Sequence, residues 1–225
     1  MHIEPGIVDG TKIVLSYATA AAAGGYAVKL ATDAAREQGA ASLVMRTVAT
    51  STLVLFFFEI LPHFSVGVSE VHFIFGSTLF LIFGAAPAAL GLAIGLLLQG
   101  LLLVPTDLPQ YGMNVTTLLV PLFAINTLAA RIVARDTAYV DLRYGQALSL
   151  STAYQAGIVA WVAFWAIYGR GLGAENMSSI ATFAGAYAMV IVVEPLVDLG
   201  VLALAKSLRG VLDGALVTPR LHNAA

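Results

Sequence analysis

The sequence predicts an integral membrane protein built from α-helices alone. Of the 225 residues, 59% are hydrophobic and only 11% are charged, whereas a soluble domain carries about 25% charged residues. Apolar runs with few charges recur along the chain at lengths suited to crossing a bilayer as helices. We therefore expect one transmembrane domain over residues 1–225, with an N-terminal segment 1–11, a helical bundle 12–205 and a tail 206–225.

Seven apolar segments are expected to form the bundle of transmembrane helices. The run from His72 to Val104 is too long for one crossing, and Gly84-Ala85-Ala86-Pro87 divides it, because proline is tolerated in the first turn of a helix. The expected spans are 12–31, 44–62, 71–84, 86–104, 113–134, 147–168 and 180–205.

Basic residues predict the orientation, because they are enriched on the cytoplasmic side of membrane proteins. With the N-terminus outside, only Lys12 and Arg170 lie on the outer side. We thus expect the N-terminus outside, inserted into the bundle, and a cytoplasmic C-terminus. The nine basic residues on the inner side would be Lys29, Arg36, Arg46, Arg131, Arg135, Arg143, Lys206, Arg209 and Arg220.

Several classes of function are disfavoured by what the sequence lacks. It has no Cys, which excludes disulfides, thiolate zinc sites and iron–sulfur clusters. It has no phosphate-binding Walker loop, no His-Glu-x-x-His motif and no Gly-x-Ser-x-Gly elbow, so we expect no enzyme activity. The net charge of −2 gives no indication of nucleic-acid binding. No signal-peptide pattern is visible, so Met1 is expected to be the mature N-terminus.

The first residues, Met1-His2-Ile3, predict a metal site. The α-amine of Met1, the backbone nitrogen of His2 and its imidazole can close fused chelate rings around a divalent metal. His72, where the outer loop Pro62–Val71 enters the third span, could supply a fourth nitrogen. Square-planar nitrogen sites suit Ni(II) and Cu(II), and low-spin Co(II) could also use one, whereas Zn(II) prefers a tetrahedron.

Other polar residues are secondary candidates, because polar groups within spans are costly and often functional. Glu59 ends the second span. Glu194 and Asp198 lie four apart on one face of the seventh, where a structural ion pair or hydrogen bond is favoured over metal ligation. Three further residues border the outer loops and could line the site or fix the tautomer of a ligand: His63, Gln99 and Asn114.

Three motifs and the N-terminus together resemble a known family. The segment 64–73 resembles the pattern Pro-x-Pro-Gly-Gly-Thr-Ser-x-His-Leu, with Gly67 and His72 matching and Ser69 standing for Thr, although the charged Glu70 is atypical. The stretches 99–102 (Gln-Gly-Leu-Leu) and 112–114 (Gly-Met-Asn) are also similar, while 105–109 departs from the family's Gly-Asp-Gly-Gly-Leu. The chain thus resembles the CbiM/NikM family, the substrate-binding component of cobalt and nickel energy-coupling-factor transporters.

The resemblance implies a mechanism and partners. Met1, His2 and His72 would hold Co(II) or Ni(II) as the transported substrate, without an organic cofactor. The chain would lie in the inner membrane of a prokaryote and dock onto a transmembrane coupling protein driven by two cytoplasmic ATPases. Small residues let helices approach closely, either within the chain or at a partner. By analogy, the docking surface on the first helix would be Ala18, Ala22, Ala23 and Ala27.

Three alternatives remain open from the residues alone. An intramembrane metalloenzyme would use His72 with Glu59 or Glu194 and would keep an open coordination position. An ATP-independent metal/proton carrier would use Glu194 and Asp198. A vitamin-binding relative of the same architecture would need an organic pocket lined by aromatic residues of the last three spans.

Overall fold

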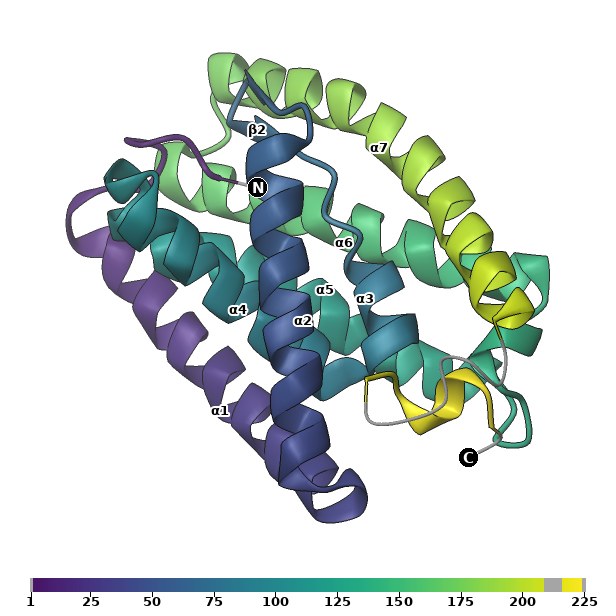
Figure 1. Cartoon of the computed structure of the whole chain (residues 1–225). Coiled ribbons are helices and arrows are strands. Elements are labelled where there is room, and N and C mark those ends of the chain that lie inside the picture. The colour runs from purple at the N-terminus through teal and green to yellow at the C-terminus, as the bar shows by residue number, and fades with distance from the viewer. Residues whose placement is uncertain (1, 209–215, 224–225) are drawn as a thin grey trace.

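The computed structural model describes residues 2–208 and 216–223, and within these ranges the chain forms seven α-helices and one β-hairpin (Figure 1). Short 3₁₀ turns, η1 (Gly10–Lys12), η2 (Pro105–Gln110), η3 (Tyr139–Asp141) and η4 (Pro219–Leu221), connect them. The helices are α1 (Ile13–Gln38), α2 (Ala40–Ile60), α3 (Gly76–Phe83), α4 (Ala85–Leu102), α5 (Tyr111–Ile132), α6 (Tyr144–Arg170) and α7 (Ala174–Ser207).

Six helical segments in the described part of the chain are long and apolar enough to cross a membrane, and the short helix α3 is not one of them. The six segments contain α1, α2, α4, α5, α6 and α7, so the protein is a multi-pass membrane protein. Small residues bring neighbouring helices together: a Cβ added at Gly91 of α4 would lie 2.1 Å from the hydroxyl oxygen of Thr50 on α2. Side-chain packing within the chain thus accounts for the small residues of α4.

The predicted third span, 71–84, is wrong over residues 71–75. Only Gly76–Phe83 is helical; the chain leaves a strand at Val71 and reaches the helix through Phe75, whose backbone is left-handed (φ 53°). Residues Phe64–Val66 (β1) and Ser69–Val71 (β2) form an antiparallel hairpin, so the fold is not all-α. β-Branched valines favour the pleated conformation there, and a glycine with positive φ, Gly67, makes the turn. In Figure 1 the extended stretch enters the bundle and leads into α3.

Two buried carboxylates stabilise this extended stretch. Glu194 on α7 accepts hydrogen bonds from the backbone N–H groups of Ile74 (2.5 Å) and Phe75 (3.1 Å). Asp198, one turn further, accepts a hydrogen bond from the hydroxyl of Ser77 at 2.6 Å and another from Thr78. Non-helical backbone is tolerated at membrane depth only where protein satisfies its polar groups, and negative charge is favourable at a helix N-terminus. Both acids therefore support the start of α3.

Basic residues lie at both ends of the bundle. At the N-terminal end, Lys12 donates to the carbonyl of Gly169 (2.7 Å). At the opposite end, where α2 begins and α3 ends, the buried Arg46 donates to the carbonyl of Phe83 (2.8 Å). Arg209 lies outside the described residues. Lys12 and Arg46 thus lie at opposite ends of the bundle, while the side of the membrane that each end faces stays a prediction.

Candidate metal centre

The N-terminal segment lies against β2 as a short extra strand. Ile3 forms an antiparallel bridge with Ser69, and the backbone N–H of Glu70 donates to the carbonyl of His2 at 2.9 Å. The hydroxyl of Ser69 donates to the same carbonyl, also at 2.9 Å. Backbone and side-chain hydrogen bonds thus fix His2 beside the hairpin, 68 residues away from Glu70 in sequence.

Further contacts bury the segment at the end of the bundle. The backbone N–H of Ile3 donates to the side-chain carbonyl of Asn114 on α5 at 2.9 Å. Ile3, Ile7 and Val8 all belong to the hydrophobic core, each at 2% exposure or less. A Cβ added at Gly169 of α6 would lie only 1.9 Å from the carbonyl oxygen of Ile7, so the segment needs a glycine at this crossing. The segment is therefore an integral part of the packed structure.

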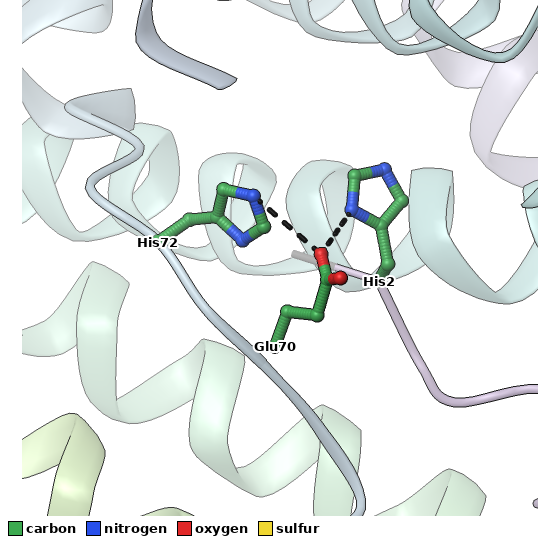
Figure 2. Close-up of side chains that lie close together, drawn as sticks. All are labelled: His2, Glu70 and His72. Atoms are coloured by element: carbon green, nitrogen blue, oxygen red, sulfur yellow. Dashed lines mark hydrogen bonds and ion pairs between the residues drawn. The ribbon is translucent and has the colours of Figure 1, made fainter. Parts of the chain in front are cut away.

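Two buried imidazoles and one carboxylate meet at this point (Figure 2). The rings of His2 and His72 lie 5.3 Å apart, centroid to centroid, and both residues are at most 5% exposed. Glu70 Oε2 lies 2.8 Å from His2 Nδ1 and 3.6 Å from His72 Nε2. One ligand atom from each of the three residues lies within 4.8 Å of the others, which is compact enough for one metal ion. Met1 lies outside the described residues.

The electrostatics keep both imidazoles in the neutral form that binds metals. Burial lowers the pKa of His2 and strongly lowers the pKa of His72. Partial burial acts to raise the pKa of Glu70, but the hydrogen bond from His2 and positive charge in the surroundings outweigh this effect, and the pKa of Glu70 is lowered. Neither ring nitrogen of His72 has a hydrogen-bond partner in the described structure. Unpartnered buried nitrogens are unusual in proteins and are free to bind a metal.

The other predicted residues lie around this cluster in different roles. The ring of His63 stacks on that of His72, with centroids 4.8 Å apart and planes 5° from parallel. The side-chain amide of Gln99 donates a hydrogen bond to the carboxylate of Glu59 at 2.7 Å, so these two predicted residues pair with each other. One carboxylate oxygen of Glu194 accepts hydrogen bonds from the two backbone N–H groups just before α3, and the other accepts a hydrogen bond from the side chain of Gln155.

A small cavity borders His2. Its volume of about 10 Å³ is enough for about one water molecule. An organic ligand would not fit there. The lining includes Gln99, Asp107, Tyr111 and Asn114.

The predicted docking residues of α1 divide into two pairs. Ala23 and Ala27 are buried inside this chain, at 8% and 4% exposure. Ala18 and Ala22 are exposed. Docking of a partner on α1 stays a prediction, and the exposed pair is the part of the set that lies on the surface.

Two residues of the site, Glu70 and Asp107, were not among the predicted ligands. Asp107 Oδ2 lies 3.7 Å from His2 Nε2, on the side of the ring away from Glu70. Residues i and i+2 of a strand point to the same face, whereas in a helix they point apart. A helix beginning at residue 71 would direct the side chains of Glu70 and His72 apart, which is why Glu70 was not predicted as a ligand. An extended chain at this point places both side chains on the same face.

Comparisons with known proteins place the chain in a family and give its fold a relative among solved structures. The model of a family described as the cobalt uptake substrate-specific transmembrane region, CbiM, matches residues 2–212. A search of curated proteins found no match. Among solved structures, the fold is similar to one titled "Crystal Structure of an Truncated Transition metal Transporter", with a TM-score of 0.62 and 16% identity over 93% of this chain and 98% of that one.

Proposed function

Because the chain belongs to the CbiM family of cobalt uptake substrate-specific transmembrane regions, we propose that it captures Co(II) or Ni(II) at the centre formed by its N-terminal segment and His72. The family match confirms the resemblance found in the sequence. The observation that carries the proposal is the position of His2. Backbone pairing with β2 holds its imidazole 5.3 Å from that of His72, whose buried nitrogens lack hydrogen-bond partners.

The proposed chelate uses nitrogen atoms. His2 supplies an imidazole and a backbone nitrogen, His72 an imidazole, and Met1 its α-amine. Metal entry breaks the hydrogen bond between His2 Nδ1 and Glu70, because the ring nitrogen that completes a six-membered chelate ring with the backbone nitrogen is Nδ1. The metal must release protons from these groups, so binding weakens in acid.

Delivery of the metal would follow docking to a membrane coupling protein with two cytoplasmic ATPases, in the inner membrane of a prokaryote. In this proposal the N-terminal end faces outward, where the metal arrives. The exposed Ala18 and Ala22 form part of the docking face on α1. The similarity of the fold to a protein titled as a transition metal transporter supports transport as the role of the bundle.

Specific contacts count against the alternatives. A vitamin-binding role needs an organic pocket lined by aromatic residues of the last three spans, whereas neither the cavity of about 10 Å³ beside His2 nor the apolar pocket of about 270 Å³ beside His72 is lined mainly by such residues. A metalloenzyme built from His72 and Glu59 needs Glu59 at the metal, but Glu59 bonds to Gln99. A proton carrier built on Glu194 and Asp198 would have to disrupt the hydrogen bonds that hold the start of α3.

The test is to purify the chain with a free N-terminus and to measure bound Co, Ni, Cu and Zn. A variant with one residue inserted between Met1 and His2 keeps every side chain but changes the chelate spacing. A matched control carries the same insertion between His222 and Asn223. We expect about one Co or Ni per chain in the native and control proteins and none in the first variant. Equal binding by all three proteins, or binding by none, would contradict the proposal.

A further inference from the structure

The ring of His63 lies on the solvent side of the metal centre. Three aromatic rings contact the imidazole of His72 in the described part of the chain, those of His2, Phe58 and His63. His2 and Phe58 are buried, at 5% and 0% exposure, whereas His63 is exposed. His72 itself is 1% exposed. His63 is therefore the ring that separates His72 from the solvent.

The hollows beside the centre suit a hydrated cation poorly. A pocket of about 270 Å³ borders His72 on the side of α7, and its lining is apolar apart from His72 itself. An ion loses its hydration at a high cost in such surroundings. The cavity beside His2 has a volume of only about 10 Å³. The polar approach to His72 thus runs past His63.

His63 offers a free nitrogen on this approach. Its Nδ1 lies 3.2 Å from the backbone carbonyl oxygen of Leu61. Because a carbonyl can only accept a hydrogen bond, Nδ1 carries the proton and donates, and the neutral ring keeps its lone pair on Nε2. An imidazole nitrogen with a free lone pair is a suitable ligand for Co(II) and Ni(II).

We propose that His63 is a transient ligand, which takes the hydrated metal from the solvent and passes it to His72. The inference rests on the proposed function, since it assumes that His72 belongs to the final chelate. His63 then controls how fast the metal enters and leaves, and it is not one of the ligands that hold the bound metal.

The stacked geometry explains why the two imidazoles act one after the other. The rings of His63 and His72 are 5° from parallel, with centroids 4.8 Å apart. An imidazole nitrogen binds a metal along its lone pair, which lies in the plane of the ring. One ion cannot lie in two separate parallel planes, so one ring binds it or the other does. The planes are no further apart than the centroids, which keeps the transfer short.

Glu70 places a negative charge beside this route. Its side chain is 25% exposed, and its Oε2 atom lies 3.6 Å from His72 Nε2. A carboxylate that reaches the solvent attracts a divalent cation and raises its rate of association. The carboxylate thus attracts the ion, and the nitrogen donors bind it.

The experiment compares the native chain with His63→Phe and His63→Ala, all with a free N-terminus. Phenylalanine keeps a ring to stack on His72 but has no nitrogen, whereas alanine removes both. Stopped-flow mixing with Ni(II) or Co(II) gives the association rate constant, and removal of bound metal by excess chelator gives the dissociation rate constant. A ligand used only on the route changes both constants by the same factor. We expect both variants to slow both steps about 10-fold at an unchanged Kd, which corresponds to about 1.4 kcal/mol in the transition state of entry.

His222→Phe is the matched control, because it removes a His near the C-terminus, away from the centre. It should bind and release the metal at native rates. Native rate constants in His63→Phe would overturn the proposal, and weaker binding in His63→Ala alone would then mean that the ring only positions His72. A higher Kd in His63→Phe would place the nitrogen among the final ligands and would overturn the transient role as well. If the native chain binds no metal, the proposed function itself fails.

Discussion

The hydrogen bond between the backbone of Ile3 and the side chain of Asn114 is predicted to control metal affinity from outside the ligand set. Asn114→Leu keeps a side chain of similar volume but removes the acceptor, which lies 2.9 Å from the Ile3 nitrogen. Both residues are 1% exposed, so water cannot replace the acceptor. An unpaired buried N–H costs about 1–3 kcal/mol. At about 1.4 kcal/mol per factor of ten, affinity should fall about 5- to 140-fold.

Competition titration with Ni(II) or Co(II) measures that loss, and hydrogen exchange at the Ile3 amide reports whether the segment loosens. The control is Thr117→Val, which removes another buried hydrogen bond of α5, to the carbonyl of Met113, without touching the segment. It should leave the affinity unchanged. Native affinity and native amide protection in Asn114→Leu would refute the argument that this bond holds the segment in its binding position.

Three further predictions concern the packing around the site. Gly169→Ala should displace the N-terminal segment and abolish metal binding while the bundle stays folded. Its control, Gly185→Ala, lies at a position with open space and should bind metal normally. The amount of bound metal measures the first effect, and circular dichroism checks that the helices remain. Glu194→Leu leaves the buried backbone N–H of Ile74 and the partly buried one of Phe75 without an acceptor, and it should lower the free energy of unfolding by about 2 kcal/mol or more, measured by denaturation in detergent. The pKa of His72 is lowered from 6.5 by burial, so below pH 6.5 the unfolded chain binds a proton that the folded chain does not. The stability of the metal-free protein should therefore fall as the pH drops below 6.5, and His72→Leu should flatten that dependence in thermal unfolding scans.

The broken third span shows where pattern analysis of the sequence reaches its limit. The residues from His72 onward are apolar enough for a helix, and a periodicity argument cannot distinguish a buried helix from a buried extended segment. The non-helical backbone before α3 is stabilised by Glu194, which lies 120 residues later and whose carboxylate accepts a hydrogen bond from the backbone N–H of Ile74. A local pattern contains no information about such a distant acceptor.

The sequence by itself determined the membrane class and six of the seven expected spans, because composition and apolar length are local properties. It also predicted His2 and His72 as metal ligands from their donor chemistry. The tertiary structure alone decided that β2 pairs with the N-terminal segment and brings Glu70 between the two imidazoles. It also decided which alanines of α1 are covered by neighbouring helices. These features depend on contacts between residues far apart in the chain, and such contacts exist only once the backbone is folded.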